Sequence, residues 1–142
     1  MEKTLNLFSA EHLMVAPEQV APLVLAYIGD AVYELYIRTY LLGDGRSKVN
    51  ILHNGAVRFV QAKTQALIMR RLEEQLTEVE AAVVRRGRNA KSLHAPKNAD
   101  LVDYKYATAF ESLIGYLYLK REYDRLAEIF RYAVETVEGG NG

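Results

Sequence analysis

The sequence lacks cysteine altogether, contains only three prolines, and has no long apolar run. Without cysteine the chain can form neither a disulfide bond nor a zinc site with thiolate ligands, which is typical of a protein in a reducing cytoplasm. No stretch approaches the roughly 18 apolar residues that a membrane-spanning helix needs, and residues 1–14 do not resemble a leader peptide. We therefore expect a cytoplasmic protein that has no membrane contact and is stabilised by packing.

The length predicts a single domain. The chain has 142 residues, and half of them are hydrophobic. That is enough apolar material for one core and too little chain for two ordinary domains. We expect one folded unit over residues 1–142, with residues 139–142 as a disordered tail.

There is also no excess of charge of either sign, since 18 basic and 18 acidic residues cancel. The distribution is uneven, however. Between residues 45 and 99 lie eleven basic and only four acidic residues, so this section carries about +7 and the two ends are correspondingly acidic. Such polarity predicts one face that attracts a polyanion.

Apolar residues recur at helical spacing, and no period-2 pattern is long enough for a sheet. We expect an all-α protein. The predicted helices run from Leu23 to Leu42 after Pro22, from an N-cap at Ser47 to about Leu76, from the Thr77-x-x-Glu80 capping box to near Gly87, from Asp100 or Asp103 to about Leu119, and from Tyr123 to Val137. Residues 85–99 lack acids, contain Gly87 and Pro96, and are expected to form an exposed loop.

Three carboxylates lie in strongly apolar predicted helices: Asp30, Glu34 and Glu111. Burying a lone carboxylate is costly, so each must reach water, pair with a cation or bind a metal ion. One interpretation is structural, with Glu34 paired to Arg38 one turn later and the other two solvated.

Glycine placement favours a functional interpretation instead. Gly29 precedes Asp30, and Gly115 lies one turn beyond Glu111. Each glycine lowers helix propensity by about 1 kcal/mol, a loss that is explained if the two helices must approach closely. Close approach would bring the carboxylates together.

At these residues a family resemblance appears. Residues 27–35 read Tyr-Ile-Gly-Asp-Ala-Val-Tyr-Glu-Leu and resemble the ribonuclease III signature Phe-Leu-Gly-Asp-Ala-Val-Leu-Glu-Leu. Residues 107–115 read Ala-Thr-Ala-Phe-Glu-Ser-Leu-Ile-Gly and resemble the family's Ala-Asp-Ala-Phe-Glu-Ala-Leu-Ile-Gly helix. Two such motifs in order, about 80 residues apart, are more specific than either alone, and the helices between them agree with the resemblance.

The departures from the family pattern are equally informative. Leu23 and Ala26 stand where the family has two further glutamates, and Thr108 stands where it has an aspartate. This reduced set is similar to the Mini-ribonuclease III branch, which lacks the double-stranded-RNA-binding domain. Too few residues follow the last predicted helix for such a domain, which needs on the order of 65.

The resemblance implies a ribonuclease III endonuclease fold and a homodimer that cuts both strands of an RNA duplex. It implies Asp30 and Glu111 as catalytic carboxylates and ligands of Mg²⁺, with Mn²⁺ as an alternative. Glu34 is a further candidate ligand, and whether one or two ions bind stays open. The implied role is maturation of the large-subunit (23S) ribosomal RNA precursor. Apolar residues of the first long helix, namely Val24, Leu25 and Ile28, are candidates for the dimer contact, although core packing explains them equally well.

Binding of RNA would then depend on the catalytic domain itself. Five basic residues in or near the predicted loop are the candidates for phosphate contacts: Arg85, Arg86, Arg88, Lys91 and Lys97. The structural alternative is an ordinary solvated loop.

Other functions receive less support. The sequence has no His-Glu-x-x-His motif, phosphate-binding glycine loop or evident serine triad. A helical nucleotide pyrophosphohydrolase would need a second acidic cluster to match Glu73, Glu74 and Glu78. A catalytically inactive ribonuclease III fold, serving as an RNA-binding or ribosome-associated scaffold, remains the main rival because carboxylates are missing, and a bare interaction module leaves both motifs unexplained.

Overall fold

The computed structural model describes residues 13–43, 45, 48–98 and 100–139, and across these it contains helices and no strand, so the all-α expectation is confirmed. The α-helices are α2 (Pro22–Gly43), α3 (Val49–Val60), α4 (Ala62–Leu72), α5 (Glu78–Asn89), α6 (Asp100–Leu119) and α7 (Tyr123–Gly139), with short 3₁₀ turns η2 (Pro17–Gln19) and η3 (Glu73–Gln75). None of the described helices is long and apolar enough to span a membrane.

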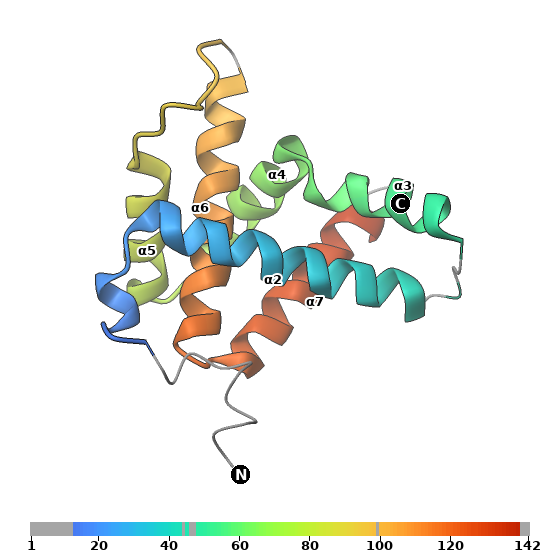
Figure 1. Ribbon diagram of the computed structural model, residues 1–142, viewed down its shortest axis with the longest axis horizontal. Coiled ribbons are helices and arrows are strands. Elements are labelled where there is room, and N and C mark those ends of the chain that lie inside the picture. Colours follow the sequence, from blue (N-terminus) through green and yellow to red (C-terminus); the bar gives the residue numbers. More distant parts are fainter. Residues whose placement is uncertain (1–12, 44, 46–47, 99, 140–142) are drawn as a thin grey trace.

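Helix α6 is the centre of the fold. It contacts α2, α4, α5 and α7, which surround it (Figure 1). Every residue from 107 to 117 is buried except Glu111, which keeps partial access to solvent. A helix that is apolar on all sides must be enclosed by others, and this explains why the second motif contains so few polar residues.

Helix α2 crosses α6 through one face. That face consists of residues spaced four apart, all buried: Leu25, Gly29, Tyr33, Ile37 and Leu41. The Tyr33 ring meets Phe110 of α6 edge to face at 5.0 Å, and its hydroxyl donates to the Phe59 carbonyl at 3.2 Å. The helix predicted for this segment is therefore confirmed, with its core on one side.

The long second helix predicted from the sequence is wrong as a single element. Gln61 adopts an extended conformation (φ −67°, ψ 148°) and separates α3 from α4, and η3 follows α4. The break lets α3 pack on α2, where the Phe59 ring meets that of Tyr40, while α4 packs on α6. No glycine or proline marks this position, and the proposed N-cap, Ser47, lies outside the described residues.

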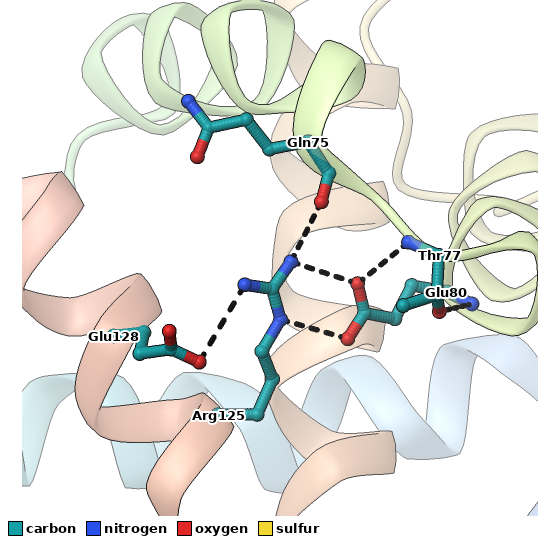
Figure 2. A network of polar contacts seen from close by, with 5 residues as sticks. All are labelled: Gln75, Thr77, Glu80, Arg125 and Glu128. Carbon is teal, nitrogen blue, oxygen red and sulfur yellow. Dashed lines mark hydrogen bonds and ion pairs between the residues drawn. The ribbon is translucent and has the colours of Figure 1, made fainter.

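The predicted capping box at the start of α5 is confirmed. The Glu80 amide donates to Thr77 Oγ1 at 3.1 Å, and the Thr77 amide donates to Glu80 Oε1 at 3.0 Å. Glu80 also accepts two hydrogen bonds of 2.9 Å from the Arg125 guanidinium of α7, which donates a third to the Gln75 carbonyl (Figure 2). This network joins α5, α7 and the turn before α5.

The basic segment differs from its predicted form. Arg85, Arg86 and Arg88 lie in the last turns of α5, which continues to Asn89, and the loop begins only at residue 90. At its other end, Asn98 Oδ1 accepts from the Asp100 amide at 3.0 Å. Asp100 is therefore the first helical residue and not the cap. Asp103, the alternative cap, is one turn inside α6 and pairs with Arg70.

Candidate active site

The two glycines expected to bring the carboxylates together do so. A Cβ atom added to Gly29 would lie 1.8 Å from the Glu111 carbonyl oxygen, and one added to Gly115 would lie 1.9 Å from the Leu25 carbonyl oxygen. The backbones of α2 and α6 are thus in direct contact at this crossing. Because Asp30 follows Gly29 and Glu111 supplies the contacting carbonyl, the crossing itself sets the position of both carboxylates.

Asp30 and Glu111 form a coupled pair. Burial raises the pKa of Glu111 to about 8, and both the charge of Asp30 and a hydrogen bond with it add to the rise, as does the charge of Glu34. Asp30 itself is exposed. Two carboxyl groups this close cannot both ionise easily, so the pair holds a proton near neutral pH unless a cation compensates.

A third helix contributes a residue that the sequence reasoning missed. Gln65 of α4 has only 1% of its surface exposed, and its side-chain amide opposes the rise in the Glu111 pKa. Its Nε2 atom nevertheless has no hydrogen-bond partner of normal distance and angle among the described residues. One sequence signal was available: Gln65 begins the i, i+3, i+4, i+7 stripe that continues through Ile68, Met69 and Leu72.

Glu34 is placed differently from the other two. It lies one turn beyond Asp30 and pairs with Arg38 at 3.7 Å, as in the structural interpretation of the sequence. Across the described residues, no three His, Cys, Asp or Glu side chains gather into a group able to hold a metal ion. The described residues thus bring two carboxylates together, and the charge of Glu34 adds to the rise in the pKa of Glu111.

Residues 23–122, which hold both motifs and the glycine crossing, match the Ribonuclease III domain family. The chain belongs to the ribonuclease III family. It is 45% identical to the Mini-ribonuclease 3 of Thermoanaerobacter sp. (strain X514), over 97% of this chain and 99% of that protein. It is 50% identical to the Mini-ribonuclease 3 of Brevibacillus brevis, over 91% of this chain and 96% of that protein.

A crystal structure of a Fusobacterium nucleatum protein shares the fold, with a TM-score of 0.75 and 32% identity over 82% of this chain and 93% of that one. The resemblance to the Mini-ribonuclease III branch is confirmed by these relatives. The expected class of enzyme, a ribonuclease III-type endoribonuclease, follows from this membership.

Two of the three positions at which this ribonuclease III chain lacks the family's carboxylates are buried. Thr108 is buried, and its hydroxyl donates to the Tyr104 carbonyl of its own helix at 2.9 Å. Ala26 is buried as well, whereas Leu23 is exposed. None of these three side chains can supply a negatively charged ligand. The folded site therefore has fewer carboxylates than the family pattern contains.

The Asp30 and Glu111 pair fits a hard divalent cation. No cationic side chain of the described residues forms an ion pair with either carboxylate. Oxygen ligands and uncompensated negative charge are what Mg²⁺ selects, and Mg²⁺ often uses only one or two carboxylates because it keeps several waters. The chemistry of this donor pair is therefore compatible with the ion that the resemblance implies.

The five basic candidates fall into two groups. Arg86 donates to the Glu18 carbonyl at 3.3 Å, and Arg88 pairs with Glu73 at 3.8 Å and lies 5.6 Å over the Tyr106 ring. Both are partly engaged by the domain itself. Arg85, Lys91 and Lys97 are exposed and, within the described part of the chain, form no ion pair. Lys91 also lines a pocket of about 260 Å³ together with Tyr104 and Lys105.

Proposed function

We propose that this ribonuclease III-type enzyme hydrolyses phosphodiester bonds in double-stranded RNA, with Asp30 and Glu111 as its catalytic carboxylates and ligands of Mg²⁺ or Mn²⁺. The observation that carries the proposal is the coupled carboxylate pair at the α2–α6 crossing, where burial and mutual repulsion raise the pKa of Glu111 to about 8. The two glycines lower the stability of their helices, and the two carboxylates that they bring together repel each other. Such a loss of stability is typical of a functional site.

The chain's own groups have distinct roles in this proposal. Glu111 is held rigidly by a buried segment, and exposed Asp30 forms the solvent side of the site. A bound divalent cation would supply an activated water and neutralise charge developing on the phosphate. Glu111 would then be ionised, because an adjacent cation favours the charged form of a carboxyl group.

Binding of the duplex is assigned to the basic side of the molecule. The exposed cations Arg85, Lys91 and Lys97 are free to reach phosphates, and the described residues from 81 to 98 include no acid that would repel RNA. Arg86 and Arg88 lie in the same turn of α5, and each is also engaged within the domain, Arg86 by the Glu18 carbonyl and Arg88 by Glu73. An A-form duplex is recognised mainly through such backbone contacts.

A homodimer would place two such sites on opposite strands of one duplex. Helix α2 offers an apolar stripe for the contact: Val24 and Tyr27 lie three residues apart, Leu35 follows about two turns later, and the three are 50%, 77% and 69% exposed. Of the three residues first considered, Val24 is exposed and Ile28 is half-buried, whereas Leu25 is 1% exposed and belongs to the core. Leu25 is thus excluded from the contact.

The cellular substrate proposed here is the precursor of the large-subunit (23S) ribosomal RNA in the cytoplasm. Membership of the Mini-ribonuclease III branch supports this assignment. Mapping the 5′ and 3′ ends of that RNA in cells with and without the gene would test it, because loss of the enzyme should leave extended ends.

The alternative function is that of an inactive RNA-binding scaffold, which is consistent with the small number of carboxylates at the site. Cleavage decides between them. Purified protein should cut a long perfect RNA duplex with Mg²⁺ and not with EDTA, and Asp30→Asn and Glu111→Gln should each reduce cutting on the order of 100-fold or more. Glu135→Gln, an exposed carboxylate of α7, is the matched control and should cut normally. A folded wild type that binds RNA and never cuts it would favour the scaffold.

A further inference from the structure

Gln65 occupies a position where an apolar side chain would be expected. It lies in the first turn of α4, on the face that continues with Ile68, Met69 and Leu72 into the core. Only 1% of its surface is exposed, and its Nε2 atom has no hydrogen-bond partner in the described structure. A buried amide without a partner opposes folding, so packing alone does not explain glutamine here.

The surroundings indicate what the amide faces. Helix α4 packs against α6, and Gln65 is close enough to the Glu111 carboxyl group to influence its ionisation. Helix α2 brings Asp30 to the same carboxyl group. Glu111 thus has a carboxyl group from α2 and an amide from α4 as neighbours, while Thr108, one turn earlier on α6, is bonded to its own backbone.

We infer that Gln65 is a positioning residue that orients the Glu111 carboxylate for ligation of the divalent cation, an inference that rests on the proposed function. An amide N–H donates to one carboxylate oxygen and leaves the other directed at the cation. A lysine or arginine at this position would neutralise the carboxylate and compete with the divalent cation. The amide is neutral, so it can orient the carboxylate without such competition. A chain with few carboxylates depends more on the orientation of each one.

The first test replaces the amide with an apolar side chain of similar length, Gln65→Met. The matched control is Gln61→Met, the same change at an exposed residue four positions earlier. Three quantities are measured: the Tm without metal, the affinity for Mn²⁺ alone by electron paramagnetic resonance, and the single-turnover cleavage rate. Gln65→Met should keep or raise the Tm, yet bind Mn²⁺ and cleave RNA roughly 10-fold less well. Gln61→Met should match the wild type in all three.

A second variant tests the geometry independently. Gln65→Glu has nearly the same shape and would bring a third carboxylate toward Asp30 and Glu111. If Gln65 faces the site, this variant should have a lower Tm than the wild type without metal, and Mn²⁺ should raise its Tm by more than it raises that of the wild type.

The outcomes separate this inference from the function on which it rests. A Gln65→Met protein with wild-type Mn²⁺ affinity and cleavage would overturn the inference, as would a fall in activity that only follows a fall in Tm. Equal Mn²⁺ responses of Gln65→Glu and wild type would also overturn it. Wild-type protein that neither binds Mn²⁺ nor cleaves RNA would instead overturn the proposed function itself.

Discussion

Gly29 and Gly115 face each other where α2 crosses α6. A Cβ atom on Gly29 would lie 2.8 Å from the Gly115 nitrogen, and one on Gly115 would lie 3.1 Å from the Gly29 nitrogen. These distances leave no room for a side chain on either residue, and the obstructing atoms are backbone, which cannot rotate away. Asp30 and Glu111, the two carboxylates beside this crossing, are therefore held by a contact that forms only when the fold is complete.

The first prediction concerns this crossing. Gly29→Ala and Gly115→Ala should each destabilise the protein by about 3 kcal/mol or more, because the helices must separate to admit a methyl group. Gly43→Ala is the control, since a Cβ there meets nothing within 4 Å. Urea unfolding monitored by circular dichroism measures all three, and alanine variants at the crossing as stable as Gly43→Ala would contradict the geometry.

The second prediction concerns pH. The pKa of Glu111 is about 8 in the folded protein against an ordinary value of 4.5, so between these values the folded state holds a proton that the unfolded state has released. Stability from this group should therefore fall as pH rises from about 4.5 to 8, and then level off.

Glu111→Gln removes this dependence. Without metal it should be more stable than wild type at pH 8 and above, by on the order of 3 kcal/mol, with no such gain below pH 4.5. Thermal unfolding in EDTA across pH 5–9 measures the difference, and adding Mg²⁺ at pH 8 should raise the wild-type Tm alone. Parallel pH curves for the two proteins would refute the coupling of Asp30 and Glu111.

The third prediction concerns the pair Glu80 and Arg125 (Figure 2). Burial opposes ionisation of Glu80, but the hydrogen bonds from Arg125 and Thr77 and the charge of Arg125 together outweigh it and leave the pKa of Glu80 below its ordinary 4.5. Arg125→Met should cost about 2–3 kcal/mol, since it leaves a carboxylate that is 4% exposed without its partner.

The double variant Glu80→Gln, Arg125→Met is the control for that experiment. Glutamine keeps the capping box, so part of the lost stability should return. The contribution of the pair should be present above about pH 4.5 and disappear as pH falls through the lowered pKa of Glu80. A double variant no more stable than Arg125→Met would show that the charge of Glu80 is not the cause.

The fourth prediction separates two arginines of α5. Arg85→Ala should weaken binding to an RNA duplex several-fold and reduce the slope of log K against log salt by about 1, with no change in Tm. Arg88→Ala should also lower the Tm, because it removes the contacts with Glu73 and Tyr106. Arg131→Ala, at an exposed residue of α7, serves as the control. Unchanged RNA affinity in both α5 variants would place the RNA surface elsewhere.

Local patterns predicted much of the fold. The spacing of apolar residues identified α2 and α7 within two residues at each end and α6 at its C-terminal end, and the capping box located the start of α5. These features depend on contacts between neighbours in the sequence, so they can be recognised without the tertiary structure. The break at Gln61 could not be recognised in this way, because it arises when α3 packs on α2 and α4 packs on α6.

The sequence by itself determined the helical class and the two motifs with Asp30 and Glu111. It also showed two glycines inside predicted helices, Gly29 and Gly115, whose loss of helix propensity indicated a close approach of those helices. Only the tertiary structure decided that Gly29 and Gly115 are opposite each other, that Thr108 is bonded to its own helix, and that Gln65 of α4 faces Glu111. The physical reason is that helical periodicity is a local property, whereas the ionisation of Glu111 depends on burial and on charges brought from other helices.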